Sequence, residues 1–282
     1  MPGTLFVVAT PIGNLDDITL RAIRVLKEVD LIACEDTRHT RKLLSHYGIS
    51  KPMVSYHEHN ERARGGELVK KLEDGASIAL VSDAGTPLVS DPGYRLVADA
   101  IAHGLTVVPI PGASASIAAL SVSGLASDSF TFAGFLPSRK SARRARLAEL
   151  SKLDSTLILY EAPHRARETL ADMLEVLGDR PCVVAREMTK LHEAFLRGRL
   201  SEISFPDGAA RGELVLIIGR GDVQPRTLGE QSNSITDEIA RIMKEEGVDQ
   251  KTALKRVARG RGMGKSEAYR LLLEERASKP LR

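Results

Sequence analysis

The stretch Ser77–Gly93, SIALVSDAGTPLVSDPG, decides the fold class, because a short apolar run leads directly into a long polar loop. Residues 77–81 are expected to form a strand, and open α/β sheets bind ligands just past the ends of their strands. The loop Ser82–Gly93 offers free backbone amides and carboxylates, and Gly85 would let a ligand approach the backbone closely. We therefore expect a ligand-binding loop here, with a long connecting turn as the alternative.

Similar units recur on both sides of this stretch. Helical patterns are expected over residues 19–29, 61–73, 94–103 and 113–121. Further apolar runs bounded by Gly, Pro or Asp predict strands at residues 5–9, 30–34, 106–110, 131–134, 156–160, 181–186 and 213–219. Alternation of strand and helix predicts an α/β fold with largely parallel pairing.

The pattern changes after Ser123-Gly124, where a second sheet with a cationic helix over residues 139–153 is expected. A polar stretch with glycine and proline near residue 222 is typical of a linker. The predicted organisation is an N-terminal α/β domain (1–123), a second α/β domain (124–221), a linker (222–234) and a helical module (235–282).

Composition favours a globular protein that works in the cytoplasm. The chain has 282 residues and a net charge of only +3, with 43% hydrophobic residues. No apolar run is long enough to span a membrane, and the N-terminus lacks the features of a secretory signal. Cys34 and Cys182 lie in apolar segments, so buried thiols are expected rather than a disulfide or a zinc site.

The C-terminal part is locally cationic and is predicted to form three helices, at residues 235–246, 250–259 and 265–275. Their spacing resembles a helix-turn-helix, which suggests contact with RNA or DNA. A small packing bundle whose charges face water is the alternative. The residues expected to contact RNA are Lys251, Lys255, Arg256, Arg259, Arg261, Lys265 and Arg270.

Two further strand ends carry candidate ligand loops. Thr10–Leu15 follows the first strand but has neither a dinucleotide-binding glycine motif nor a phosphate-loop lysine, so an ordinary turn is equally compatible. Pro109–Ser116 again follows a strand and contains small residues, although Ser114 could simply cap a helix.

Polar clusters also follow the apolar strands, at residues 35–39, 57–61, 160–165 and 186–190. Such clusters are typical of active-site rims, although surface salt-bridge networks would also explain them. His57 and His59 flank Glu58 at the spacing of metal ligands, but no third ligand is evident, so no metal is expected.

Taken together, these segments resemble the tetrapyrrole methylase-like superfamily and, within it, the ribosomal RNA ribose methyltransferases. The resemblance runs from Leu5 to about Gly219. It rests on residues 8–15, 35–40, 55–60, 82–93, 134–137 and 160–165. Ala113 and Ala126 depart from the family pattern, and both are small changes.

The resemblance implies two α/β domains with S-adenosylmethionine bound in the cleft between them, in a homodimer. It also implies methylation of a cytidine 2′-hydroxyl in the decoding region of small-subunit ribosomal RNA, either free or in the assembled subunit. The implied cofactor contacts are Pro11, Asp83, Ala84, Gly85, Thr86, Val89, Ser114, Ala115, Tyr160, Glu161, Met188, Gly212 and Glu213.

A ribose hydroxyl is a weak nucleophile, so the reaction needs in-line placement and a proton acceptor. The candidate bases are Glu35, Asp36, His57 and Glu58. Arg38, Arg165 and Lys190 are expected to hold phosphates or to stabilise a developing alkoxide. The alternatives are a methylase of the same superfamily acting on a corrinoid or porphyrin ring, and a helix-turn-helix regulator without turnover.

Overall fold

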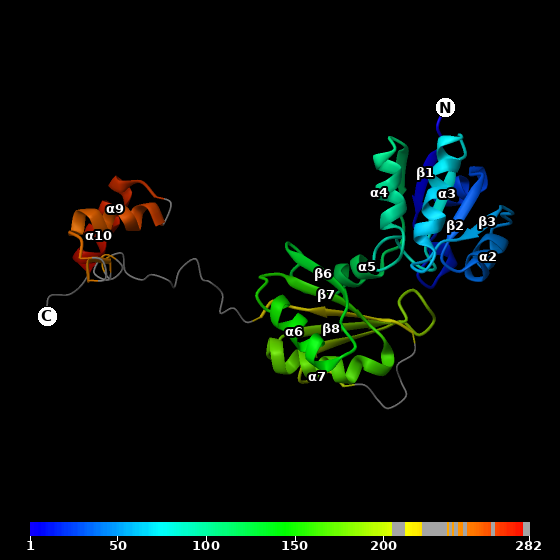
Figure 1. Ribbon diagram of the computed structural model, residues 1–282. Helices are drawn as coiled ribbons and strands as arrows, with labels where there is room; N and C mark the ends of the chain where they lie inside the picture. Colours follow the sequence, from blue (N-terminus) through cyan, green and yellow to red (C-terminus); the bar gives the residue numbers. More distant parts are fainter. Residues whose placement is uncertain are drawn as a thin grey trace. The chain divides into compact units, whose positions relative to one another are not determined.

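The computed structural model describes residues 1–204, 212–221, 236, 239, 242–244, 247–260 and 263–278. Its contacts divide the chain into two units, Met1–Gly221 and Asp222–Arg282. The first unit holds two sheets in separate lobes, and the second holds a group of helices (Figure 1). Among the described residues, no helix is long and apolar enough to cross a membrane.

The N-terminal lobe is built on a fully parallel sheet, as the alternation of strands and helices predicts. Its strands are β1 (Thr4–Val8), β2 (Leu31–Cys34), β3 (Met53–Ser55), β4 (Ile78–Val81) and β5 (Thr106–Ile110), in the order β3-β2-β4-β1-β5. One face packs against α1 (Leu20–Glu28) and α2 (Thr37–His46). The other packs against α3 (Glu61–Glu73) and α4 (Tyr94–Ala102). All five strands therefore end at one edge, where their loops gather.

Helix α2 begins inside what the sequence suggested was a polar strand-end cluster. Asp36 accepts a hydrogen bond from the Arg38 backbone at 2.8 Å, which caps the first turn. Thr40, Leu43 and Leu44 then recur at helical spacing and are buried against the sheet. The charged residues between them are left on the outside of the helix.

The second lobe has a mixed sheet, so the expectation of parallel pairing is wrong for most of it. Its strands are β6 (Phe130–Phe135), β7 (Thr156–Glu161), β8 (Pro181–Arg186), β9 (Ala194–Arg199) and β10 (Leu214–Ile218), in the order β6-β7-β10-β8-β9. Only the β6–β7 ladder is parallel. Helices α6 (Lys140–Leu150) and α7 (Ala166–Leu177) cover one face.

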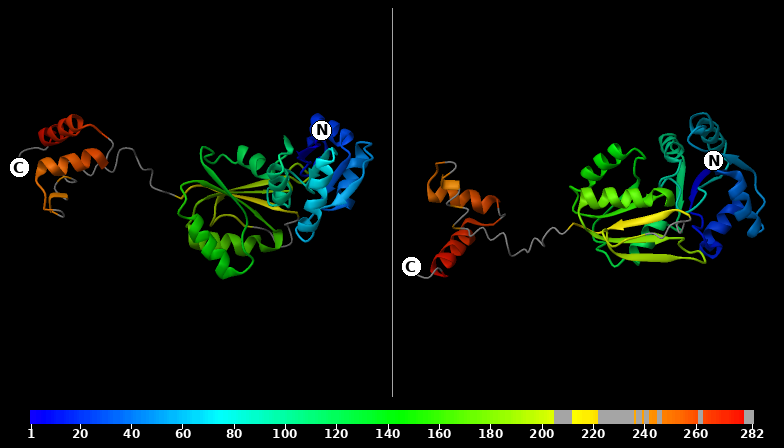
Figure 2. Two further views of the ribbon diagram at one scale, coloured as in Figure 1. Left: turned by 45° about the horizontal axis from the view of Figure 1, so that its top comes forward. Right: turned by 90° about the horizontal axis from the view of Figure 1, so that it is seen from below.

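The opposite face of this sheet is covered by α5 (Ala115–Ser121), a helix expected to belong to the first lobe. Its Ala119 and Leu120 pack with Ile158 of β7 and Val215 of β10. The chain therefore changes lobe between β5 and α5, at residues 111–114 (Figure 2). Contacts join both predicted α/β domains into the single unit that ends at Gly221, and the predicted linker 222–234 lies outside the described residues.

In the second unit, α9 (Gln250–Gly260) and α10 (Lys265–Ser278) match the helices expected over residues 250–259 and 265–275. Ala253, Leu254 and Val257 of α9 share a core with Ala268 and Leu272 of α10. The third expected helix lies mostly outside the described residues, although 236, 239 and 242–244 are helical.

Candidate functional site

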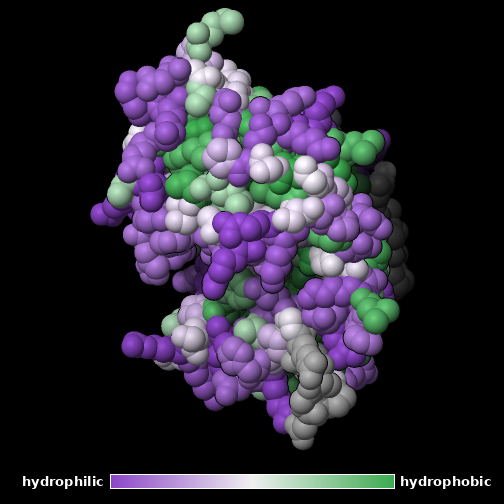
Figure 3. Space-filling model, turned by 90° about the vertical axis from the view of Figure 1, so that its right-hand side faces the viewer, coloured by the Kyte–Doolittle hydropathy of each residue, from purple (hydrophilic) through white to green (hydrophobic). Residues whose placement is uncertain are grey.

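A cavity of about 850 Å³ is lined by residues of both lobes. The N-terminal lobe contributes the loops that follow β1, β2, β4 and β5, and the second lobe contributes residues of β6, β7 and β10 and the end of β8. Viewed from the side, the hydrophilic surface is hollowed between the lobes (Figure 3). The site therefore lies where the carboxyl ends of the parallel strands face the second sheet.

The loops of the N-terminal lobe are tied together by their backbones. Thr10 and Gly85 exchange two backbone hydrogen bonds, of 2.8 and 3.0 Å, which join the loop after β1 to the loop after β4. The Thr86 hydroxyl donates a hydrogen bond of 3.1 Å to the Ala113 carbonyl oxygen, which joins the loop after β5 to the other two. Gly85 has a φ of 81°, which explains why glycine occupies this turn.

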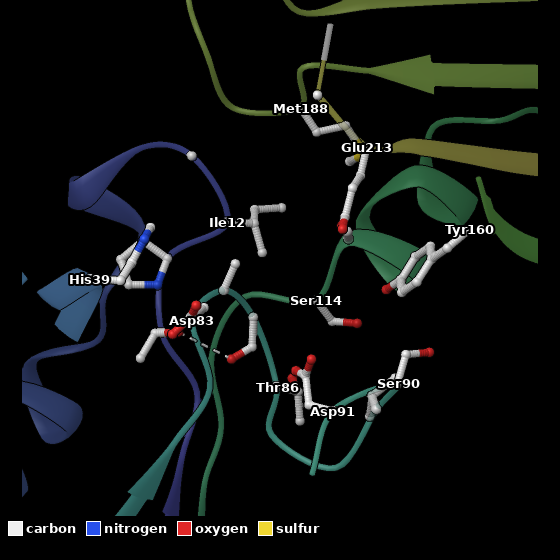
Figure 4. Close-up of a pocket in the computed structure, with 18 of the residues that line it drawn as sticks. Ile12, His39, Asp83, Thr86, Ser90, Asp91, Ser114, Tyr160, Met188 and Glu213 are labelled. Carbon is white, nitrogen blue, oxygen red and sulfur yellow. Dashed lines mark hydrogen bonds between the residues drawn. The ribbon is translucent and has the colours of Figure 1, made fainter. Parts of the chain in front are cut away.

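The loop after β4 holds a strained backbone next to the cavity. Leu88 and Ser90 have φ values of 72° and 68°, a region that L residues rarely adopt. Strain of this kind persists only where the surrounding structure enforces it. Asp91 directly follows these residues and lines the cavity, with its carboxylate among the lining side chains (Figure 4).

Carboxylates dominate the charge of the N-terminal side of the cavity. Burial and, after it, the negative charge of Glu35 together raise the pKa of Asp91 to about 6. Burial likewise raises the pKa of Glu35, together with the negative charges of Asp83 and Glu58. The cavity is therefore suited to a cationic ligand, and Glu35 and Asp91 are both poised to hold a proton.

The second lobe supplies an aromatic and apolar wall. Tyr160 of β7 meets Phe132 and Phe135 edge to face, with ring centroids 5.0 and 5.6 Å apart. Met188 and Val215 continue the wall across the end of β8 and β10. Burial raises the pKa of Tyr160, so its hydroxyl stays protonated and can donate a hydrogen bond (Figure 4). A flat ring would find a matching surface here.

The two lobes approach closely beside residues 187–190. A Cβ added to Gly13 would lie 2.7 Å from the Lys190 Cγ, the Met188 carbonyl oxygen and the Thr189 hydroxyl. Glu187 and Thr189 both have positive φ, and Lys190 forms a 3.0 Å ion pair with Glu187. A glycine at position 13 is therefore required for the lobes to close one side of the cavity.

Of the predicted cofactor contacts, all but one line this cavity. They are Pro11, Asp83, Ala84, Gly85, Thr86, Val89, Ser114, Ala115, Tyr160, Met188, Gly212 and Glu213. Glu161 is the exception, because neighbouring strand residues point to opposite faces of a sheet. Its buried carboxylate accepts hydrogen bonds from the Thr169 hydroxyl of α7 and from the Ala162 backbone.

Two of the seven proposed catalytic residues, Glu35 and Lys190, line the cavity. Asp36 pairs with the exposed Arg38 instead, and this contact lowers the pKa of Asp36 to about 2. Arg165 donates to the Leu136 carbonyl at 2.9 Å. It holds the loop after β6 rather than facing the cavity.

His57 and Glu58 also lie outside the cavity lining. The His57 backbone donates to Asn60, and the ring of His57 contacts the Asn60 side chain and the His59 ring. Glu58 is exposed, and its negative charge contributes to the raised pKa of Glu35. Within the described residues, no group of three His, Cys, Asp or Glu side chains could hold a metal ion.

Sequence reasoning missed several lining residues, notably Ser90, Asp91, His39, Lys42 and Glu187. Asp91 belongs to the loop that the sequence singled out, but nothing in the sequence showed that its carboxylate, like that of Asp83, lines the cavity. His39 and Lys42 are three residues apart, so they share one side of α2. Recognising that helix would have placed both on the rim.

The tail residues predicted to contact RNA are only partly described. Lys251, Lys255, Arg256 and Arg270 are exposed on α9 and α10. Arg261 and the side chains of Arg259 and Lys265 lie outside the described residues.

Comparison with known proteins identifies the class. The family described as Tetrapyrrole (Corrin/Porphyrin) Methylases matches residues 4–204, and the chain belongs to it. Members of this family use S-adenosylmethionine as the methyl donor. The same fold is found in a crystal structure of diphthine synthase (TM-score 0.61, 17% identity, covering 77% of this chain and 90% of that one). It is also found in the uroporphyrin-III-C-methyltransferase of Thermus thermophilus (TM-score 0.54, 20% identity, 78% and 93%).

Relatives with much higher identity carry a more particular name, ribosomal RNA small subunit methyltransferase I. The protein of that name from Halalkalibacterium halodurans is 49% identical over 97% of this chain and 96% of its own length. That of Pseudomonas aeruginosa is 53% identical over 77% and 78%. That of Bacillus subtilis is 44% identical over 95% and 93%. The similarity to the first and third therefore extends into the helical C-terminal unit.

Proposed function

We propose that this protein transfers the methyl group of S-adenosylmethionine to the 2′-hydroxyl of a cytidine in the decoding region of small-subunit ribosomal RNA. The observation that carries the proposal is the acid-lined cavity between two lobes of tetrapyrrole methylase type. The high identity to relatives named as small-subunit RNA methyltransferases supports RNA as the substrate.

The cavity residues fit the methyl donor, which supplies a cationic sulfonium carrying an activated methyl group. Asp83, Asp91 and Glu213 provide negative charge for its positive groups, and the Tyr160 wall provides an apolar surface for its adenine. Small residues at 84, 85, 114 and 115 leave backbone amides and carbonyls accessible. These residues would bind and orient the donor and exclude water around it.

We assign the proton acceptor to Glu35, the one predicted base that lines the cavity. Its raised pKa makes it a better base than an ordinary carboxylate. The negative charge of Glu35 in turn helps to raise the pKa of Asp91, which lines the same cavity. Glu35 can therefore accept the proton of the ribose hydroxyl as that oxygen attacks the methyl group.

Lysine side chains at the rim complete the site. Lys190 and Lys42 line the cavity, where an ammonium group would stabilise negative charge developing on the attacking oxygen. Lys190 is held by Glu187, which fixes its position but reduces its net effect. Lys42 has no ion-pair partner among the described residues and remains available to the substrate.

The remaining parts of the proposal concern assembly. The protein is a cytoplasmic homodimer, and its substrate is small-subunit ribosomal RNA or the assembled small subunit. The C-terminal unit adds phosphate contacts through Lys251, Lys255, Arg256, Arg259, Arg261, Lys265 and Arg270. These contacts should weaken as salt rises, because RNA binding releases counterions.

The test is methyl transfer from labelled S-adenosylmethionine to small subunits from cells that lack this protein, followed by nucleoside analysis. Label in 2′-O-methylcytidine is the expected result. Cofactor binding without label on subunits or free RNA would reject RNA as the substrate and favour a tetrapyrrole. An Asp83→Asn variant, which alters a cavity carboxylate, should bind the cofactor more weakly than a matched Asp16→Asn variant outside the cavity.

A further inference from the structure

Helix α2 stands between the main cavity and a second hollow. His39, Lys42 and Leu43 line the main cavity, while Thr37, Arg41 and Ser45 line a second hollow of about 530 Å³. The spacing of each set matches one side of a helix. A ligand seated in the cavity and extending across α2 would therefore reach the second hollow next.

The second hollow has the chemistry of a phosphate site. Arg41 and Lys51 supply positive charge, and Thr37, Ser45 and Ser50 supply hydroxyl groups. Phosphate oxygens are commonly bound by arginine guanidinium groups, which can donate two hydrogen bonds at once, and by hydroxyl groups. In the described part of the chain, neither Arg41 nor Lys51 has an acidic partner within ion-pair distance, so both charges are available.

The sequence around the second hollow carries positive charges and no acidic residues to balance them. Residues 37–57 include Arg38, Arg41, Lys42 and Lys51 but no aspartate or glutamate. Of these four, only Arg38 is neutralised, by Asp36. Arg41 and Lys42 are exposed and Lys51 is half-buried.

The acidic cavity gives this basic surface a specific role. Glu35, Asp83 and Asp91 repel the phosphates of an RNA strand whose ribose enters the cavity. Those phosphates must be held outside, within the reach of the neighbouring nucleotides. Helix α2 separates the cavity from the second hollow. Because a helix with its side chains is about 10–12 Å wide, the second hollow lies about 10–12 Å from the cavity.

We propose that Arg41, Lys51 and the hydroxyls of the second hollow form a phosphodiester-binding site. It holds the single strand of RNA that continues from the target nucleotide, with Lys42 between this site and the cavity. The inference rests on the proposed function, because it takes RNA as the substrate. The site is separate from the helical C-terminal unit.

The test compares the full-length double variant Arg41→Gln/Lys51→Gln with a matched control, Arg62→Gln/Lys71→Gln. The control residues lie on α3, on the other face of the sheet, and are exposed without ion-pair partners in the described chain. The measurements are the affinity for a labelled single-stranded RNA of the decoding-region sequence over a salt series, the KM for small subunits, and the cofactor affinity. Thermal unfolding checks that each variant is folded.

We expect the α2 variant to bind RNA on the order of tenfold more weakly, with a salt slope smaller by about 1.4, because each lost phosphate contact removes about 0.7. Its KM for subunits rises in parallel, while kcat and cofactor affinity stay unchanged. RNA affinity and salt slope equal to those of the control would overturn the inference. A raised KM with unchanged RNA binding would also overturn it and point to a ribosomal protein instead.

The same experiment separates failure of the inference from failure of the proposed function. If the unaltered protein transfers no methyl group to subunits or RNA, the proposed function fails. The RNA-binding comparison between the two variants would still decide whether the second hollow binds phosphodiesters.

Discussion

The two lobes supply the cavity in different ways. In the N-terminal lobe the strands are parallel, so their ends meet at one edge and the loops after them carry the polar groups. In the second lobe, mostly antiparallel strands present side chains from one sheet face, as Tyr160 and Val215 do. Loops therefore provide the charge and chemistry, and a sheet face provides the apolar wall. The following predictions test this division, from the largest effect to the smallest.

Replacing the proposed proton acceptor should have the largest effect on activity. Glu35→Gln keeps the shape of the side chain but removes its basicity, so we expect kcat to fall by roughly 100- to 1,000-fold. Single-turnover methyl transfer to small subunits measures this fall. Glu58→Gln, outside the cavity, is the control and should lose far less. An E35Q variant that retains more than a tenth of the activity would contradict the assignment.

Stability in the second lobe should depend most on a buried ion pair between α6 and α7. Arg143 and Asp172 are buried, and two nitrogens of the guanidinium contact the carboxylate at 2.7 and 2.6 Å. Asp172→Ala leaves the arginine charge buried without its main partner, which should cost about 3–5 kcal/mol. Chemical denaturation measures the loss.

The matched control is Glu168→Ala, because Glu168 meets the same arginine at 3.5 Å from an exposed position. Exposed ion pairs contribute about 1 kcal/mol or less. Equal losses from the two variants would show that the buried pair does not stabilise this lobe. Cofactor affinity should be unchanged in E168A, since the pair lies on the sheet face away from the cavity.

Removing the strained loop's carboxylate should stabilise the protein. The pKa of Asp91 is raised from 3.8 to about 6, so its ionised form is disfavoured in the folded state. Protonated Asp91 favours folding below pH 3.8, and that contribution is lost as the pH rises through about 6. With partial exposure taken into account, Asp91→Asn should gain about 2 kcal/mol above pH 6 and little near pH 4.

Thermal unfolding across this pH range measures the gain, and methyl transfer should fall in the same variant. Stability and activity then change in opposite directions, as expected for a group whose role is functional. A destabilising Asp91→Asn at pH 7 would show that the carboxylate is structural. The unaltered enzyme should also lose activity as the pH falls below about 6, because Asp91 becomes protonated.

The apolar wall should have the smallest effect. Tyr160→Ala removes the ring that packs on Phe132 and Phe135, and we expect cofactor affinity to fall about tenfold, consistent with 1–3 kcal/mol for stacking on an aromatic ring. Tyr160→Phe keeps the ring and should bind almost normally. Calorimetric titration with the cofactor distinguishes the two. An equal loss in both variants would assign the role to the hydroxyl rather than to the ring.

The sequence predicted four of the five strands of the first lobe, because each of the four is a compact apolar run ended by a polar loop. It missed β3, which has only three residues, and β9, whose six residues include two arginines and a glycine. It also missed α2, which begins within a polar cluster. The ligand loops were found from strand ends alone. The sequence could not show which way individual side chains face. Period-two alternation separates Tyr160 from Glu161, but which of them faces the cavity depends on where α5 and α7 pack.

The path of the chain between the lobes has a consequence for motion. Within the described parts of residues 1–221, the chain passes from one sheet to the other only at 111–114, and Ser114 and Ala115 line the cavity directly after that passage. Any rotation of one lobe against the other would pivot on this segment. The pivot would then be part of the binding surface, so a ligand in the cavity would restrict such a rotation.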